Sequence, residues 1–483
     1  MQWKQLDNPD KKHYDVVICS VPWTDTELPL MAPAVLKKTV EQAGMTCLAV
    51  DLNIEIVNHT LQSPNLQKFI KFFFEEKLDP EIGDEVYAIL KSSAEQILSF
   101  NPKWVGLSLI SYVCQTSAKW ICYFIRKLAP HVKIVIGGPG CLPTLTGDSI
   151  FVRQLLQAKL IDYHIRGDGE ISFYQLLIGN EQYPGINDVT WQELSMDQLA
   201  ALPFPDYDDY IFDFYQTNAI PLIGSRGCVR QCTFCDYIAN WKKFQWRTAD
   251  NIFNEILFQV EKYGITNIKF QDSLVNGNQK EFYRLLELLA NYNDNNHNKK
   301  ISWSAYFIFR EHNAASAREW ELLAKSGALV LAVGVENFNQ HIRYAIGKKF
   351  TDEAIIYHLE QALQHNIKIS LLHITGYINE TQKDIDYIKQ WLRNNTRFKD
   401  ILLIHWGTGL SIFDNTYLGN NKEALGITMI GNNPHEWISK HTDSTPEIRA
   451  RWSVELIKLS KELGYSTSDT THDMHYLLEK SFL

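Results

Sequence analysis

The chain has 483 residues, enough for two or three domains of ~100–200 residues each. Hydrophobic residues make up 45% and charged residues 21%, a composition typical of a chain that forms a hydrophobic core. The net charge of −9 argues against a general nucleic-acid surface, because such surfaces need Lys and Arg to neutralise phosphates. The chain has no apolar run of the ~20 residues that span a bilayer and no leader-like start, so we expect a cytoplasmic protein without a membrane span.

Strands alternate with helices through residues 1–200. Strands are predicted at 15–21, 46–51, 104–111, 132–140 and 161–170, and helices at 32–44 and 117–130. Because parallel neighbours require crossovers, this alternation predicts an α/β fold with a doubly wound parallel sheet. Ligands of such sheets bind beyond the carboxyl ends of the strands. We therefore expect a ligand at the loops that follow Val21, Leu109 and Ile136.

A second alternation follows the proline-rich, acidic segment 202–210. Strands are predicted at 219–224, 267–272, 301–309, 328–336, 367–376 and 401–409, and helices at 248–264, 279–291, 316–326, 352–365 and 381–394. This pattern predicts a full or partial βα-barrel, in which the chemistry belongs at the C-terminal strand ends. The predicted organisation is a domain over 1–200, a linker over 201–214, a barrel over 215–400 and a C-terminal region over 401–483.

Two further features belong to these later residues. The polar stretch 291–300 is predicted to be a loop, and 446–465 to be an amphipathic helix. Trp406, Trp437 and Trp452 are expected to pack in the core rather than to line a substrate pocket.

Three of the eight cysteines form a cluster. Cys228, Cys232 and Cys235 have the spacing C-x3-C-x2-C, and three thiolates on one loop each ligate one iron of a cubane cluster, leaving the fourth iron open. A closed zinc site requires four ligands, and the nearest downstream histidine is His297. An open zinc site and a group of inert thiols are the other interpretations. The five remaining cysteines are expected to be buried and inert: Cys19, Cys47, Cys114, Cys122 and Cys141.

The pattern C-x3-C-x-aromatic-C at the end of a first barrel strand resembles the radical S-adenosylmethionine superfamily. The resemblance implies that the three cysteines hold a 4Fe-4S cluster and that S-adenosylmethionine binds the fourth iron. It also implies one-electron cleavage of that cofactor to methionine and a 5′-deoxyadenosyl radical, which abstracts hydrogen from an unactivated carbon. The electron would come from a donor such as flavodoxin or ferredoxin.

The likeness extends over about 170 residues and implies neighbours for S-adenosylmethionine. These are Phe234 against the adenine, Asp272 near the methionine amino group, and Arg310 and Glu336 around the cofactor. The turn 376–381 resembles the G-x-P-x-E-T turn of the subclass, although Ile378 stands in place of the proline. Asp272 or Glu336 taken alone would more often be a solvated carboxylate or part of a core ion pair.

Residues 1–200 resemble the cobalamin-binding domain that is fused to one subclass of the superfamily. The likeness rests on the stretches 106–111, 135–140 and 162–170, and the implied cobalamin contacts are Ser108, Ser111, Gly137, Gly138 and Pro139. The D-x-H-x-x-G motif that supplies a cobalt ligand elsewhere is absent, since no histidine lies between residues 13 and 59. Cobalamin would thus be bound without a histidine ligand or not at all. A glycine turn after a strand is also common in any doubly wound sheet.

The leading hypothesis is a cobalamin-dependent radical methylase of an unactivated carbon, a reaction whose difficult steps belong to the cofactors. The main alternative is a radical cyclase, rearrangement or oxidation enzyme whose N-terminal domain binds substrate instead of cobalamin. A methylthiotransferase is disfavoured because a second cysteine triad is missing. A non-catalytic metal-binding protein is the alternative from another class. The substrate is expected to be a small molecule or natural product, and its identity and the substrate-activating residues are not readable from the sequence.

Overall fold

The computed structural model describes residues 13–141, 150–311, 316–407, 409–431 and 434–468. It divides into two compact units, Met1–Pro221 and Leu222–Leu483. The predicted linker falls within the first unit. The polar start of the chain and the last residues of the predicted C-terminal region lie outside the described residues. None of the described helices is both long and apolar enough to cross a membrane.

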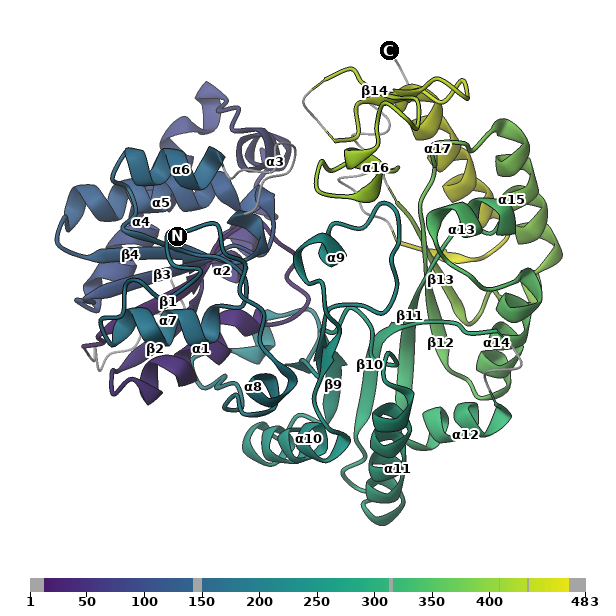
Figure 1. Cartoon of the computed structure of the whole chain (residues 1–483), viewed down its shortest axis with the longest axis horizontal. Helices are drawn as coiled ribbons and strands as arrows, with labels where there is room; N and C mark the ends of the chain where they lie inside the picture. Colours follow the sequence, from purple (N-terminus) through teal and green to yellow (C-terminus); the bar gives the residue numbers. More distant parts are fainter. Residues whose placement is uncertain (1–12, 142–149, 312–315, 408, 432–433, 469–483) are drawn as a thin grey trace. The chain divides into compact units, whose positions relative to one another are not determined.

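The first unit is built on a five-stranded parallel sheet with the order β2-β1-β3-β4-β5 (Figure 1). Its strands are β1 (Val16–Ser20), β2 (Cys47–Asp51), β3 (Trp104–Ser108), β4 (Lys133–Gly137) and β5 (Tyr163–Ile165). Its helices are α1 (Met31–Gln42), α2 (Leu52–Thr60), α3 (Leu66–Glu75), α4 (Gly83–Ser99), α5 (Gln115–Leu128), α6 (Ile150–Gln157), α7 (Gly169–Leu177) and α8 (Met196–Ala200). The predicted doubly wound sheet is confirmed.

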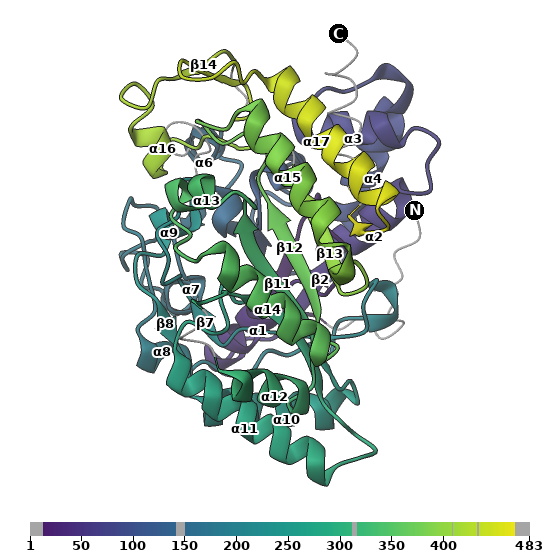
Figure 2. The same cartoon turned by 90° about the vertical axis from the view of Figure 1, so that its right-hand side faces the viewer.

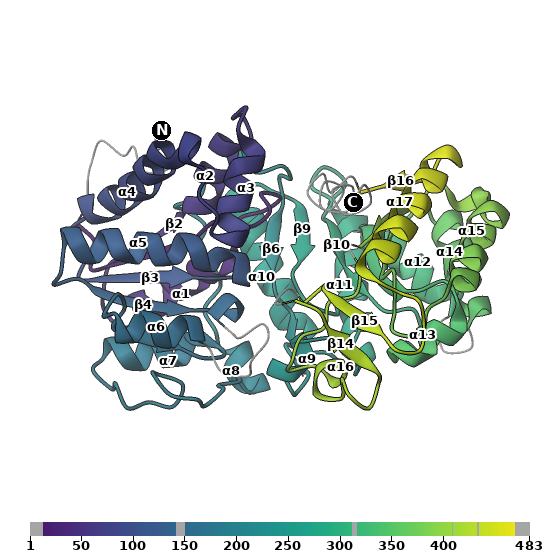
Figure 3. The same cartoon turned by 90° about the horizontal axis from the view of Figure 1, so that it is seen from above.

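Both faces of this sheet are covered, which explains why its strands are apolar at nearly every position. Side chains alternate along a strand, so Val17 and Cys19 of β1 join a core with α2, α3, α4 and α5. Val16 and Ile18 point the other way, into a core with α1 and α7. Figure 3 shows α4 and α5 on one side of β3 and β4 and α7 on the other.

The second unit is built on a seven-stranded sheet with the order β16-β13-β12-β11-β10-β9-β6, whose edge strand β6 begins just before the boundary at Leu222. Its strands are β6 (Ile220–Leu222), β9 (Asn267–Phe270), β10 (Ser302–Phe307), β11 (Ala328–Glu336), β12 (Lys368–His373), β13 (Leu402–Trp406) and β16 (Ser466–Thr467). Neighbouring strands from β9 to β16 are parallel, and their order across the sheet follows the chain. This arrangement confirms the predicted partial βα-barrel.

Helices of the second unit alternate with these strands, and Figure 2 shows α14 and α15 lying along the sheet. They are α10 (Ala249–Tyr263), α11 (Gln279–Asn295), α12 (Ala317–Lys325), α13 (Gln340–Ile346), α14 (Asp352–Gln364), α15 (Gln382–Asn394) and α17 (Pro446–Glu462). Shorter elements are β7 (Ser225–Arg226), α9 (Tyr237–Asn240), β8 (Gln245–Trp246), α16 (Tyr417–Asn420), β14 (Ile427–Met429) and β15 (Trp437–Ser439). Strands β7 and β8 pair antiparallel, as do β14 and β15.

The predicted loop at 291–300 is wrong in its first half, because α11 continues to Asn295. The reason is Asn293, whose buried side chain accepts a hydrogen bond from the Ile301 amide (2.8 Å) and donates one to the Ile301 carbonyl (2.9 Å). This pair of bonds supplies the polar partners that a buried Asn requires. It also fixes the start of the next strand to the helix.

The predicted roles of the tryptophans and of the scattered cysteines are confirmed. Trp406, Trp437 and Trp452 are buried, and their indole nitrogens donate to Ser460, to the Leu410 carbonyl and to Gln382 respectively. The five cysteines outside the cluster are all buried.

Candidate functional site

The loop that carries the cysteine cluster begins directly after β6, and the end of β9 fastens its first half. The carboxylate of Asp272 accepts hydrogen bonds from the Gly224 amide (2.9 Å) and from the Ser225 hydroxyl. The Ser273 hydroxyl donates to the Gly227 carbonyl. Gly227 has φ +82°, and a Cβ there would collide with the Lys243 carbonyl, so only glycine fits this close approach.

Three other segments fasten the second half of the loop, and Thr233 is the residue they share. Its amide donates to the Ile346 carbonyl at the end of α13 (3.0 Å), and its carbonyl accepts from the Leu418 amide in α16 (3.0 Å). Its hydroxyl lies 2.8 Å from the Tyr377 hydroxyl. The cysteine loop is therefore held from both sides by elements that are far apart in the sequence.

The three clustered cysteines are free thiols in this loop. Cys232 is 7% exposed, whereas Cys228 and Cys235 are half-buried. Burial raises the pKa of Cys232 to about 11, and the neighbouring Cys235 and Cys228 contribute to the increase. The thiols thus lie close enough to interact electrostatically.

In the described part of the chain, no group of three or more His, Cys, Asp or Glu side chains is already arranged to hold a metal ion. The donor set itself, three thiols on one short loop, fits a cubane cluster with one open iron.

The residues predicted to surround S-adenosylmethionine lie in different settings. Phe234 packs against the same apolar cluster as Cys232. Burial raises the pKa of Asp272 to about 6, against the hydrogen bonds from Ser225 and Gly224, so this carboxylate supports the loop. Arg310 forms an ion pair with Glu319 in α12, which gives it a structural partner away from the loop.

Glu336, the last of these residues, forms an ion pair with Lys348, a residue that the sequence reasoning did not identify. The two charged atoms are 3.1 Å apart. Nothing in the pattern Gly347-Lys348-Lys349 distinguishes the first lysine from the second, and only the fold shows which one is paired. All four predicted roles at the cofactor stay predictions.

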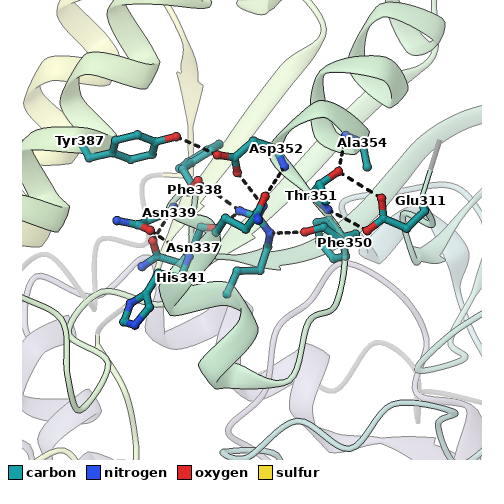
Figure 4. A network of polar contacts seen from close by, with 12 residues as sticks. Glu311, Asn337, Phe338, Asn339, His341, Phe350, Thr351, Asp352, Ala354 and Tyr387 are labelled. Carbon is teal, nitrogen blue, oxygen red and sulfur yellow. Dashed lines mark hydrogen bonds and ion pairs between the residues drawn. The ribbon is translucent and has the colours of Figure 1, made fainter.

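A network of polar contacts centred on Arg343 joins the segments before and after α13. Figure 4 shows Asn337, Phe350 and Asp352 among its members. The guanidinium of this fully buried arginine donates to the Asn337 and Phe338 carbonyls before the helix, at 3.0 and 3.1 Å. It also donates to the Phe350 carbonyl (2.9 Å) and to the Asp352 carboxylate (2.6 Å) after the helix. One side chain thus joins the two chain segments that flank α13.

The turn after β12 owes its shape to Glu380. Its buried carboxylate accepts hydrogen bonds from the Gly376 and Tyr377 amides and from the Asn337 side chain. Burial raises the pKa of Glu380 to about 7, although these hydrogen bonds act in the opposite direction. The turn that resembles the subclass motif is therefore a carboxylate-centred structure, and Ile378 is accommodated in it.

This raised pKa has a consequence for stability. In the unfolded chain Glu380 ionises near its ordinary pKa of ~4.3. The stability that protonated Glu380 gives to the folded state is therefore fully present below that pH and is lost as the pH rises through about 7. We expect the unfolding free energy of the wild type to decline between about pH 5 and about pH 8 because Glu380 ionises. In Glu380→Gln this decline should be smaller, by up to roughly 3 kcal/mol. Urea denaturation at the two pH values measures it. Glu360→Gln, at an exposed carboxylate, is the control, and an unchanged pH slope in Glu380→Gln would contradict the expectation.

In the first unit, the predicted cobalamin contacts come together at the carboxyl ends of β3 and β4. Ser108 and Gly137 are register partners, and the loops beyond them are joined by bonds from the Leu109 amide to the Gly137 carbonyl (2.9 Å) and from the Gly140 amide to the Leu109 carbonyl (2.8 Å). Ser111 and Pro139 lie in these same loops and are half-buried. The strand order reverses between β1 and β3, and ligands of such sheets bind at this reversal.

Close packing explains the glycines between these two loops. Gly138 has φ +98°, and a Cβ on it would lie 2.5 Å from the Leu109 carbonyl oxygen. Gly179 has a similar φ of +91° but has nothing within 4 Å of its Cβ position. Substitutions at the two glycines therefore distinguish two free-energy costs. One is the cost of a side chain in the left-handed backbone conformation, and the other is the cost of steric crowding.

We expect Gly138→Ala to lower the free energy of unfolding of the first unit by about 1–3 kcal/mol more than Gly179→Ala. Both variants strain a left-handed backbone conformation, but only the first forces the 109–111 loop to move. Urea denaturation of the full chain measures the difference. Equal losses of unfolding free energy in the two variants would show that the loops have room for an added methyl group at Gly138.

The fold and the cysteine loop together define a class of protein. Residues 222–392 match the family model of the radical SAM superfamily. This segment of the chain is therefore similar to a radical SAM domain.

Individual relatives refine this result. The chain is 25% identical over 310 residues to the anaerobic magnesium-protoporphyrin IX monomethyl ester cyclase of Synechocystis sp., a match that covers 59% of this chain and 58% of that protein. It is 21% identical over 327 residues to the cytidylyl-2-hydroxyethylphosphonate methyltransferase of Streptomyces wedmorensis, covering 56% and 57%. In both matches the chain spans less than two thirds of the relative's length.

A solved structure matches nearly the whole chain. It is the radical S-adenosylmethionine methyltransferase TsrM of Kitasatospora setae, which contains cobalamin and a [4Fe-4S] cluster. The TM-score is 0.64 at 14% sequence identity, covering 97% of this chain and 99% of that one. At this identity the likeness shows a common fold.

Proposed function

We propose that this protein is a radical S-adenosylmethionine enzyme in which Cys228, Cys232 and Cys235 hold a 4Fe-4S cluster. One observation carries the proposal: three free thiols lie on one loop directly after β6, the first strand of the partial barrel. The loop offers three ligands for four irons, which leaves one iron open to S-adenosylmethionine. Asp272, Ser273 and Thr233 fix the loop on which these thiols lie.

We further propose that the first unit binds cobalamin at the carboxyl ends of β3 and β4. Ser108 and Ser111 would donate hydrogen bonds to it, and Gly137, Gly138 and Pro139 would let the backbone approach it closely. The strand reversal between β1 and β3 and the fold shared with a cobalamin-containing structure support this assignment. The cobalt would have no histidine ligand from the first loop.

The reaction proposed is methylation of an unactivated carbon of a small, natural-product-like molecule. When bound, the cluster and S-adenosylmethionine supply a 5′-deoxyadenosyl radical and cobalamin supplies a methyl group, which is chemistry that protein side chains lack. The electron would come from a small carrier such as flavodoxin or ferredoxin. Methyltransferases among the similar proteins support this reaction.

The test is anaerobic reconstitution of the full chain with iron and sulfide, followed by mass spectrometry of the products of S-adenosylmethionine with and without added cobalamin. A methylase yields S-adenosylhomocysteine and 5′-deoxyadenosine, and protein saturated with cobalamin retains it through gel filtration. Loss of all corrinoid on gel filtration would exclude the methylase. A cubane that never cleaves S-adenosylmethionine would leave only a non-catalytic metal-binding protein.

A second candidate is a radical cyclisation or oxidation by the same cluster. The relative that favours it is the Synechocystis cyclase, at 25% identity. In the same experiment this function yields 5′-deoxyadenosine without S-adenosylhomocysteine. The product pattern therefore decides between the two reactions.

A further inference from the structure

A buried ion pair lies at the carboxyl end of β11. The Lys348 ammonium and the Glu336 carboxylate are 3.1 Å apart, and their side chains are only 12% and 9% exposed. Glu336 adopts φ +62°, a conformation that is unusual for a residue with a side chain. Gly334 leaves room for the pair, because a Cβ there would collide with the Glu336 carboxylate and come within 2.8 Å of the Lys348 nitrogen.

The chain segment just before Lys348 touches the cysteine loop. The Ile346 carbonyl accepts a hydrogen bond from the Thr233 amide, and a Cβ on Gly347 would lie 3.0 Å from the Gln231 carbonyl oxygen and 3.5 Å from the Cys232 Cα. Lys348 follows immediately, so its backbone begins beside the second cysteine of the cluster. The Arg343 network fixes both ends of α13 and so keeps this segment in place.

The ion pair keeps the lysine charged despite its burial. Burial would lower the pKa of Lys348, but the Glu336 carboxylate outweighs this effect and the pKa lies above its usual value. Lys348 is therefore a largely buried ammonium that follows directly on the segment packed against Cys232.

We propose that the Lys348 ammonium, held in place by Glu336, raises the reduction potential of the cluster on Cys228, Cys232 and Cys235. The inference rests on the proposed function, since it presumes that a cubane forms there. A cubane with three thiolates is anionic, and one electron from an external one-electron donor adds a further negative charge without breaking a bond. A nearby buried cation stabilises that reduced state more than the oxidised state.

The test is a potentiometric titration of the reconstituted full chain without S-adenosylmethionine, in which electron paramagnetic resonance measures the reduced cluster. We expect Lys348→Met to lower the ratio of reduced to oxidised cluster at a fixed potential by about tenfold, equivalent to about 59 mV for one electron. Glu336→Gln should shift the midpoint in the opposite direction, because it leaves the lysine charge uncompensated. Lys349→Met is the matched control, since Lys349 is the exposed neighbour and its loss should change nothing.

The outcomes separate this inference from the proposed function. If the wild-type protein forms no cubane, the proposed function fails. If it forms one and Lys348→Met has the same midpoint as the wild type and Lys349→Met, the inference is overturned while the proposed function stands. If circular dichroism shows that Lys348→Met does not fold, Lys348→Gln, which keeps a hydrogen-bond donor for Glu336, decides: a lower midpoint supports the inference, and an unchanged or higher one overturns it.

Discussion

Replacing Cys232 with alanine is expected to abolish cleavage of S-adenosylmethionine, by at least about a thousandfold or about 4 kcal/mol in the activation barrier. Cys232 is the central and most buried of the three clustered thiols. Two remaining thiols cannot hold a cubane that requires a protein ligand on three of its irons. Iron and sulfide content per chain and the yield of 5′-deoxyadenosine, both measured after anaerobic reconstitution, are the two readouts.

The matched control for this variant is Cys122→Ala. Cys122 is a fully buried thiol of α5, and burial raises its pKa to about 12, so it is an inert part of the core of the first unit. The control should lose stability because of the cavity it creates but keep its iron and its activity. Full iron content and normal cleavage in Cys232→Ala would disprove the assignment of the cluster.

Replacing Arg343 with methionine is expected to have the largest effect on stability, a loss of about 3–5 kcal/mol in the free energy of unfolding of the second unit. The variant leaves the carbonyls of Asn337, Phe338 and Phe350 without their donor. It also breaks the ion pair with Asp352. Leaving a buried carbonyl without a hydrogen-bond donor costs more free energy than the net contribution of the hydrogen bond that is lost.

Arg318→Met provides the comparison for this second variant. Arg318 and Glu287 form an ion pair at 3.8 Å, but their side chains are 77% and 49% exposed, and such pairs contribute about 0–1 kcal/mol. Urea denaturation followed by the fluorescence of the buried tryptophans measures both variants. Similar midpoints for the two would mean that the Arg343 network does not hold α13.

The sequence predicted the elements well where the apolar pattern is regular. The helix at 248–264 was predicted, and in the structure Thr248 caps α10 and Gly264 ends it with φ +70°. The cysteine loop was predicted because its chemistry depends on the spacing of a few neighbouring residues. Such patterns lie within one short segment, so they can be recognised without knowing how the rest of the chain folds.

Other features depend on contacts between distant residues and have no local signal. Arg310 is predicted to lie beside the cofactor, and the fold pairs its guanidinium with Glu319, a partner that no local pattern indicates. Lys348 and Lys349 are adjacent and chemically identical in the sequence, and the fold buries one beside Glu336 and exposes the other. Asn293 lies in a polar stretch that suggested a loop, yet its hydrogen bonds to Ile301 extend the helix.

The way in which Thr233 is held also affects the order of events during synthesis of the protein. Its partners, Ile346, Tyr377 and Leu418, leave the ribosome long after Cys235 does. Chains are made at ~5–20 residues per second, so the second half of the loop lacks these partners for several seconds after Cys235 is made. The second half of the loop can therefore take its final position only after Leu418 has been made, and we expect a cluster to form on a fixed loop only from that point.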